Sequence, residues 1–371
     1  MSLTKTKHII FTFLVIFLVG SQTIEASNQA SSSDVDVTST ASPVEEVEPL
    51  PVSSEPLTRT ESMLHTAVQI QIYHEGQEEA MQAAFDYMAE MERNFSTNLE
   101  GSDVYRINQA AGQEFVQVNP ETYAVIERAI EIAELSDGKF DITIGAITNL
   151  WQIGSEDARV PSDEEIQAAL SKIDYKKIAL DPQNHAVMLE EEGMVMELGG
   201  ISKGYIGGRI VDIFKPYGIT TAIINLGGNV VVMGNSPTNE TGWNVGVQDP
   251  DKSRGSIVGT QRVIDGAVVT SGIYERYLEQ DGHLYHHIMD PETGYPLDNE
   301  ISGVTVFAET SFDGDSYSTA LFLFGIEDGI QFVEQTDGIE AVFIDKDKGV
   351  HLTSGLKDTF ELTNEEYHIV D

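Results

Sequence analysis

The chain has 371 residues and a formal net charge of −40, from 61 acidic against 21 basic side chains. A surface this acidic repels nucleic acid and anionic lipid, so we exclude a nucleic-acid partner and expect any anionic substrate to need a divalent cation. The sequence has no cysteine, which excludes disulfides, zinc–thiolate sites, iron–sulfur clusters and thiol catalysis.

The N-terminus predicts an exported protein. Lys5 and Lys7 precede an apolar run at residues 9–20, which is followed by a small-residue exit at Ala26. The run holds about a dozen residues, fewer than the ~20 that span a bilayer as a permanent helix. We therefore predict a signal segment over residues 1–26, cleaved near Ala26 or retained as an uncleaved anchor, and an extracytoplasmic location.

Residues 27–61 are acidic and rich in Ser, Thr and Pro. Such a segment buries too little apolar surface to offset its ordering entropy, so we predict a disordered linker before a folded domain over residues 62–371.

Apolar periodicity predicts the elements of this domain. The predicted helices cover residues 77–94, 120–135, 206–216 and 316–324. The predicted strands cover residues 65–73, 177–180, 187–189, 195–198, 221–233, 243–248, 256–259, 267–270, 285–288, 303–307 and 340–344. Because helices and strands alternate irregularly and many strands adjoin late in the chain, we expect an α+β fold with a mixed or antiparallel sheet and flanking helices.

Two paired-glycine segments flank the helix predicted at 206–216. They are Glu197-Leu-Gly-Gly-Ile-Ser-Lys-Gly-Tyr205 and Asn225-Leu-Gly-Gly-Asn229. Main-chain amides at a helix start attract anions, and Lys203 adds a positive charge, so this pattern is typical of a phosphate site. Ordinary turns that need a positive φ are an equal alternative for either glycine pair.

A later group of polar residues suggests a metal and a proton carrier. Asp315 and Thr319 stand four residues apart, so their oxygens share one helical face and suit Mg²⁺, although Asp315 could instead merely cap the helix that it opens. His286 and His287 lack a third ligand at a usual zinc spacing, so one histidine is better assigned to proton transfer or phosphate contact.

Taken together, these segments resemble the ApbE family of FAD:protein FMN transferases. The resemblance runs from about Met63 to Phe324 in the order of the family. The matching segments are Phe95-Ser-Thr, Phe140-Asp-x-Thr-x-Gly, Asn149-Leu-Trp, Leu198-Gly-Gly-Ile-Ser-Lys-Gly-Tyr205, Asn225-Leu-Gly-Gly-Asn229, Thr270-Ser-Gly-x-Tyr-Glu-Arg276, His287-Ile-x-Asp-Pro-x-Thr-Gly294 and Asp315-x-x-Ser-Thr-Ala320.

The resemblance implies an ApbE-like fold over residues 62–371 and an enzyme that uses FAD and Mg²⁺. Such an enzyme transfers FMN from FAD to a threonine or serine hydroxyl of an acceptor protein and releases AMP. The implied acceptors are subunits of redox pumps or of extracellular electron transfer, which agrees with export and with a place at the outer face of the cytoplasmic membrane.

The resemblance also implies the roles of individual residues. The metal ligands would be the Gly200 carbonyl, Asp315 and Thr319, and the catalytic residues would be His287 and Asp315. The residues implied to contact the flavin nucleotide are Met63, Asn98, Ile142, Thr143, Ile144, Gly145, Ala146, Ile147, Glu197, Lys203, Ser271, His287 and Ile288.

The chain departs from the family pattern at three positions. Glu197 stands where the family usually has Asp, Asn98 where many relatives have Tyr, and Met63 opens Met-Leu-His-Thr instead of Met-Gly-Thr. Two other functions fit the same residues. One is an FAD pyrophosphatase that gives FMN and AMP, and the other is a non-catalytic extracytoplasmic flavin-binding protein.

Overall fold

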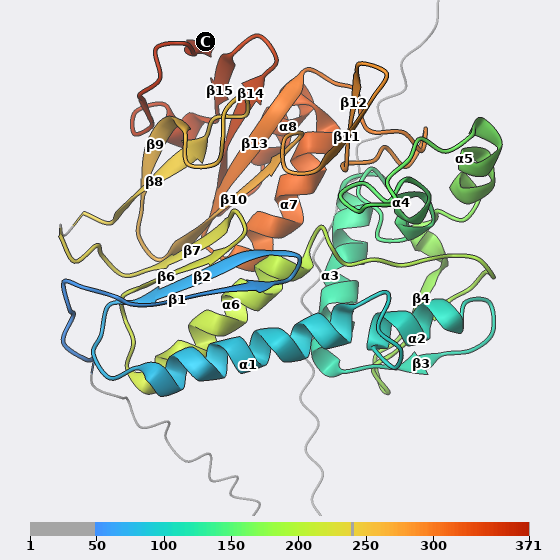
Figure 1. Ribbon diagram of the computed structural model, residues 1–371, viewed down its shortest axis with the longest axis horizontal. Coiled ribbons are helices and arrows are strands. Elements are labelled where there is room, and N and C mark those ends of the chain that lie inside the picture. The colour runs from blue at the N-terminus through green and yellow to red at the C-terminus, as the bar shows by residue number, and fades with distance from the viewer. Residues whose placement is uncertain (1–48, 239–240, 371) are drawn as a thin grey trace, which may run out of the picture. The chain divides into compact units, whose positions relative to one another are not determined.

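A nine-stranded sheet forms the frame of residues 49–238 and 241–370, the part of the chain that the computed structural model describes (Figure 1). Its strands, in spatial order, are β1 (Leu57–Met63), β2 (Thr66–Ile72), β6 (Ala222–Leu226), β7 (Asn229–Met233), β10 (Gly266–Gly272), β13 (Ile301–Ala308), β14 (Ile339–Asp345), β15 (Gly349–Leu352) and β17 (His368–Val370). Neighbouring strands are antiparallel up to β15, and β15 pairs with β17 in parallel.

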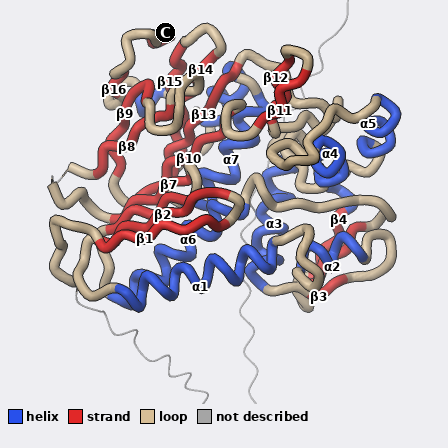
Figure 2. The backbone as a smooth tube through the Cα atoms, viewed as in Figure 1, coloured by secondary structure: helices blue, strands red, loops and turns tan. Residues whose placement is uncertain are grey.

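Different layers cover the two faces of this sheet. Along β10, Ala267 and Val269 pack into the main core, whereas Val268 between them packs into a second cluster. Since side chains alternate across a strand, these two cores lie on opposite faces. The helices occupy the first face, and the second face is covered by the small sheet of β8 (Trp243–Gln248), β9 (Ile257–Val263) and β16 (Glu361–Leu362) (Figure 2).

The helices pack on one another as well as on the sheet. In chain order they are α1 (Glu78–Phe95), α2 (Asp103–Gln109), α3 (Pro120–Leu135), α4 (Gly145–Trp151), α5 (Asp163–Leu170), α6 (Ser202–Phe214), α7 (Ser311–Phe324) and α8 (Ile326–Val333). α7 lies on β10 and β13 and packs against α6, and α6 in turn packs against α1.

Smaller strands surround the helical side. β3 (Val116–Gln117), β4 (Ile178–Asp181) and β5 (Ala186–Leu189) form a three-stranded sheet beside α2, and β11 (Tyr277–Gln280) pairs with β12 (His283–His286) as a separate hairpin (Figure 1). The fully buried Trp151 of α4 packs with Ile166 of α5 and with the ring of Tyr285 in this hairpin, at 5.3 Å between ring centroids.

The predicted α+β class with flanking helices is confirmed, and so are most of the predicted elements. The helices predicted at 77–94, 120–135 and 206–216 correspond to α1, α3 and α6. The strand predicted at 221–233 is two strands, β6 and β7, joined by the turn at Gly227 and Gly228.

The strand predicted at 195–198 is wrong. Only Val195 forms a bridge there, with Ile144. The main chain of Met196 instead pairs with the side chain of Asn108, which donates to the Met196 carbonyl at 2.9 Å and accepts from the Met196 N–H at 2.7 Å. A side-chain amide therefore takes the place of a neighbouring strand, which apolar periodicity cannot predict.

Two predicted boundaries are also wrong. β1 begins at Leu57, inside the predicted linker. The apolar pattern missed this strand because its Thr, Arg and Glu residues are typical of an edge strand rather than of a buried one. α7 begins at Ser311 and not at Asp315, since Thr310 caps it by accepting the Asp313 N–H at 3.1 Å. Asp315 therefore lies inside the helix and does not cap it.

The predicted signal segment 1–26 and the part of the predicted linker up to residue 48 lie outside the described residues. Within the described ranges, no helix has the length and apolar character needed to cross a membrane.

Two glycines of α6 should respond in opposite ways to substitution by alanine. A Cβ on Gly204 would lie 2.3 Å from Asp315 Cβ and 2.4 Å from the Ser311 carbonyl oxygen, whereas a Cβ on Gly208 would meet nothing within 4 Å. We expect Gly204→Ala to lower the free energy of unfolding by about 1–3 kcal/mol through overpacking. Gly208→Ala should raise it by about 0.5–1 kcal/mol, since alanine is the better helix former.

Urea denaturation of both variants measures this difference. Equal stabilities for Gly204→Ala and the unmodified chain would contradict the close contact between α6 and α7.

Candidate active site

A buried carboxylate joins the start of α6 to α7. Asp315 Oδ2 accepts the Gly204 N–H at 2.6 Å, and the Asp315 side chain is buried. α6 has no side-chain cap of its own, because Ile201 stands at its N-cap position. Asp315 therefore satisfies one of the free N–H groups of that helix and lies at the positive end of its dipole.

Burial and the neighbouring polar groups shift the pKa of Asp315 in opposite directions. Burial raises the pKa of Asp315, while the charge of Lys203, the Gly204 N–H and the side chain of Asn229 lower it. Asn229 accepts the Ser311 hydroxyl at 3.0 Å, but its buried Nδ2 has no hydrogen-bond partner among the described residues. Asp315 is thus a carboxylate whose ionised form calls for a further positive partner.

The three residues predicted to hold a metal lie close together where α6 approaches α7. Thr319 lies one turn after Asp315, and a Cβ on Gly200 would lie 3.7 Å from Thr319 Oγ1. The predicted metal ligands Gly200, Asp315 and Thr319 therefore lie together, and their carbonyl, carboxylate and hydroxyl oxygens suit a hard cation such as Mg²⁺. The described ranges contain no cluster of three or more His, Asp or Glu side chains that could hold a metal, so such a cation would need main-chain, hydroxyl and substrate oxygens.

Glu197 is held next to this group by its main chain. Its N–H donates to the Ile142 carbonyl at 2.8 Å, and the preceding Met196 is bound on both sides by Asn108. Thr148 Oγ1 of α4 lies 3.5 Å from Glu197 Oε2. Burial raises the pKa of Glu197, and the charges of Arg276 and Lys203 oppose that rise.

His287 lies at the base of the β11–β12 hairpin, opposite Arg276. The carbonyl of Arg276 accepts both the His287 N–H at 3.1 Å and a hydrogen bond from His287 Nδ1 at 3.3 Å. Because a carbonyl only accepts, Nδ1 must carry the hydrogen, and Nε2 is left with a free lone pair. Burial and the charge of Arg276 lower the pKa of His287 to about 3, so the imidazole is neutral.

Lys203 interacts electrostatically with Asp315, Glu197 and His287. Its charge acts on the pKa of Asp315, Glu197 and His287, so all three lie within reach of one ammonium group. The Lys203 Nζ itself donates to the Gly199 carbonyl at 3.2 Å. The predicted residues Glu197, Gly200, Lys203, His287, Asp315 and Thr319 are hence brought into one site from the 195–201 loop, α6, the hairpin and α7.

The segment 142–147 forms one wall of the site. Ile142, Gly145 and Ile147 are buried, and the fully buried Thr143 uses its hydroxyl to bind Asp141 and the Asp174 N–H. The side chains of Ile144 and Ala146 are half-buried and are the ones left open to a ligand.

Three other predicted contacts differ in how they approach the site. Ser271 donates to the Ser318 hydroxyl at 3.0 Å, and Ser318 donates to the Asp315 carbonyl at 3.2 Å, which links β10 to α7. Ile288 is a core residue that follows His287. Met63 is the last residue of β1, which forms a hairpin with β2. Because β2 pairs with β6, Met63 lies near the turn that leads from β6 to Asn229.

Asn98 is not joined to the site. It lies in the loop after α1 with an exposed side chain, and its main-chain N–H binds Ser96 Oγ at 3.2 Å. No hydrogen bond from the Asn98 side chain reaches the site residues in the described part of the chain.

Three residues join the site that the sequence prediction did not assign to it: Thr148, Asn229 and Arg276. Asn229 and Arg276 end two of the motifs quoted above, so the motifs contained the signal. Their roles emerge only from neighbours more than 70 positions away, Asp315 for Asn229 and Glu197 for Arg276.

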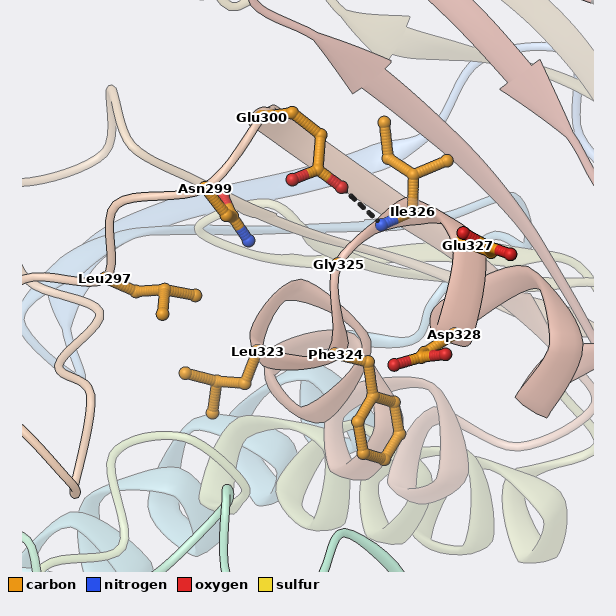
Figure 3. Close-up of a pocket in the computed structure, with 9 residues that line it drawn as sticks. All are labelled: Leu297, Asn299, Glu300, Leu323, Phe324, Gly325, Ile326, Glu327 and Asp328. Carbon is orange, nitrogen blue, oxygen red and sulfur yellow. Dashed lines mark hydrogen bonds between the residues drawn. The ribbon is translucent and has the colours of Figure 1, made fainter. Parts of the chain in front are cut away.

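A separate pocket of about 190 Å³ lies at the far end of α7 (Figure 3). It is lined by Leu297, Asn299, Glu300, Leu323, Phe324, Gly325, Ile326, Glu327 and Asp328. Glu300 points toward the start of α8 and accepts the Ile326 N–H at 2.8 Å (Figure 3). This is a helix cap, and the pocket contains none of the residues gathered around Asp315.

Known proteins resemble the chain over most of its length. The sequence pattern of the ApbE family matches residues 64–343. An FAD:protein FMN transferase of Klebsiella pneumoniae is 36% identical over 77% of this chain and 89% of its own length. One of Treponema pallidum is 33% identical over 81% of this chain and 88% of its own length.

Solved structures agree with the predicted fold. An ApbE protein of Thermotoga maritima superposes with a TM-score of 0.75 at 34% identity and covers 82% of this chain and 99% of its own. A flavin transferase ApbE of Vibrio cholerae, at 24% identity, shares the fold with a TM-score of 0.74 and covers 83% of this chain. The expected ApbE-like fold is confirmed.

The low pKa of His287 makes a testable contribution to stability. In the unfolded chain a histidine has a pKa of about 6.5, whereas His287 in the folded chain has a pKa of about 3. Between these values the unfolded state binds the extra proton, so the stability from this group is present above pH 6.5 and is lost as the pH falls toward 3. We expect His287→Gln to flatten the decline of unfolding free energy between pH 6.5 and 4, measured by urea denaturation.

The exposed His283 of the same hairpin provides the control. His283→Gln should leave the slope unchanged, and an equal slope for His287→Gln would refute a neutral His287.

Proposed function

The chain belongs to the ApbE family, and from this premise we propose that it is an FAD:protein FMN transferase. The single observation that carries the proposal is that Gly200, Asp315 and Thr319 lie together beside Lys203, with the neutral His287 within reach of the same ammonium group. Such a set can hold a pyrophosphate and accept a proton at once.

Mg²⁺ fits the oxygen donors of this site. Gly200 would contribute its carbonyl, Asp315 its carboxylate and Thr319 its hydroxyl, and substrate oxygens would complete the shell. Bound there, Mg²⁺ would offset the charge of the pyrophosphate and stabilise the AMP leaving group. The proposal also accounts for how a chain of net charge −40 binds an anionic dinucleotide.

The residues of the chain itself place and deprotonate the reactants. Lys203 attracts the pyrophosphate, and Glu197 with the 142–147 wall contacts the remainder of FAD. His287 Nε2 takes the proton of the acceptor hydroxyl, since Nδ1 is committed to the Arg276 carbonyl. The hydroxyl oxygen forms a bond to the FMN phosphorus, and the bond from that phosphorus to the oxygen bridging to AMP breaks. The products are a phosphoester-linked flavin and AMP.

The acceptor is a protein rather than a small molecule or a nucleic acid. We propose a threonine or serine hydroxyl of an extracytoplasmic redox-pump or electron-transfer subunit. The export signal predicted over residues 1–26 supports this, because it would place the enzyme outside the cytoplasm, secreted or at the outer face of the cytoplasmic membrane.

Incubation with FAD, Mg²⁺ and an acceptor protein bearing a Thr/Ser flavinylation motif distinguishes this function from its two rivals. Covalent flavin fluorescence of the acceptor on a denaturing gel, with stoichiometric AMP release, supports the transferase. AMP and FMN release without a labelled acceptor indicates a pyrophosphatase, and FAD binding without either product indicates a binding protein.

Asp315→Asn should remove transfer while preserving the fold. The amide oxygen can still accept the Gly204 N–H, but the charge that a cation needs is lost, so we expect transfer to fall by about 100-fold or more. The fall in flavinylation rate should be accompanied by weaker Mg²⁺ binding in calorimetry and an unchanged melting temperature.

Glu327→Ala, which removes an exposed carboxylate from α8, is the control and should transfer FMN normally. Undiminished flavinylation by Asp315→Asn would exclude Asp315 as a metal ligand.

A further inference from the structure

Arg276 lies just before the β11–β12 hairpin and beside the loop after α4. The side chain is exposed and lies along Gly154 in the loop after α4, where a Cβ on Gly154 would be 3.1 Å from Arg276 Cδ. In the described ranges no carboxylate oxygen lies within the 4.0 Å of an ion pair from its guanidinium. Although the chain has 61 acidic residues, the exposed Arg276 guanidinium is therefore accessible to an anion from solution.

The register of the hairpin directs Arg276 toward the site. Tyr277 pairs with His286, and the ladder continues as the His287 N–H donates to the Arg276 carbonyl at 3.1 Å. Arg276 and His287 are therefore cross-strand neighbours with side chains on one face. Tyr285, two residues before His287, shares that face and packs on Trp151 of α4, so this face of the hairpin looks toward α4.

The charge of Arg276 acts on two site residues, Glu197 and His287. Burial raises the pKa of Glu197, which lies beside Thr148 of α4, and the charge of Arg276 opposes that rise. Burial lowers the pKa of His287, and the charge of Arg276 adds to that fall. Lys203 acts on the same two groups. Two cations from α6 and from the hairpin thus border one carboxylate and one neutral imidazole, and His286 is the remaining group that acts on His287.

We propose that Arg276 binds the pyrophosphate of the substrate with its guanidinium, and that this contact couples substrate binding to the proton affinity of His287. The inference rests on the proposed function and deepens it. A guanidinium matches two phosphate oxygens at once, which an ammonium group cannot do. Lys203 and Arg276 then hold the pyrophosphate from two sides, with the oxygen donors of α7 nearby.

The coupling follows from charge neutralisation. In the free enzyme burial lowers the pKa of His287 most, and the charges of Arg276 and Lys203 lower it further. An anion bound to these cations offsets the part of the shift that comes from their charge, so the pKa of His287 rises on binding. His287 becomes an effective base for the acceptor hydroxyl when the dinucleotide is in place, because a base works best with a pKa close to the working pH.

The contact between Arg276 and the pyrophosphate is tested by measuring FAD binding with Mg²⁺ and without an acceptor, so that no FMN is transferred. Calorimetry of the full chain should show FAD binding weakened about 10- to 100-fold in Arg276→Ala and less in Arg276→Lys, which keeps the charge but loses the two-point contact. Arg254→Ala is the matched control, because Arg254 is paired with Glu275, next to Arg276 in sequence. It removes the same charge and should bind FAD within twofold of the unmodified chain.

Histidine NMR tests the coupling independently of affinity. With ¹³C-labelled histidine and His287→Gln to assign the signal, the pKa of His287 should rise when FAD and Mg²⁺ bind. In Arg276→Ala the pKa of the free enzyme should already be higher and the rise on binding smaller, whereas Arg276→Lys should keep the low starting value. If Arg276 had only a structural role, the pKa of His287 would not depend on whether residue 276 carries a positive charge.

The outcomes separate this inference from the function on which it rests. An unmodified chain that neither binds FAD nor labels an acceptor refutes the function. An unmodified chain that does both, with Arg276→Ala binding FAD within twofold or with an unshifted His287 titration, overturns the role of Arg276 alone.

Discussion

The hydrogen bond from the Gly204 N–H to the buried Asp315 carboxylate is the contact on which the site depends. It satisfies the start of α6, offsets part of the cost of burying the Asp315 charge and holds α6 against α7. The contact is possible because Gly204 lacks a Cβ, which would collide with both Asp315 and the main chain of α7. Lys203 and Thr319 take their places in the site as consequences of this helix pair.

The site concentrates positive charge in a strongly acidic protein. Net charge describes the surface as a whole, but a pKa responds to charges within a few ångströms. Lys203 and Arg276 come from separate elements and act together on Glu197 and His287. Two cations and a helix start together favour an anion there.

Main-chain atoms hold the reactive side chains in position. Asn108 binds both the N–H and the carbonyl of Met196, which carries Glu197 into the site without a strand. The carbonyl of Arg276 holds His287 in one tautomer. Both arrangements use groups that a mutation of the reactive residue itself would leave intact, so position and chemistry are separable in this site.

The sequence by itself determined the α+β class, the boundaries of α3, and the motifs that include Gly200, Lys203 and Asp315, because local periodicity and residue order are written along the chain. It missed the edge strand β1, whose polar alternation has no apolar face, and it mistook the Asn108-paired segment at 195–198 for a strand. Only the tertiary structure decided that Asp315 caps α6 rather than its own helix. It also decided that Arg276 and Lys203 both act on Glu197 and His287. These facts depend on distances between residues far apart in sequence, since Coulomb and hydrogen-bond energies follow separation in space.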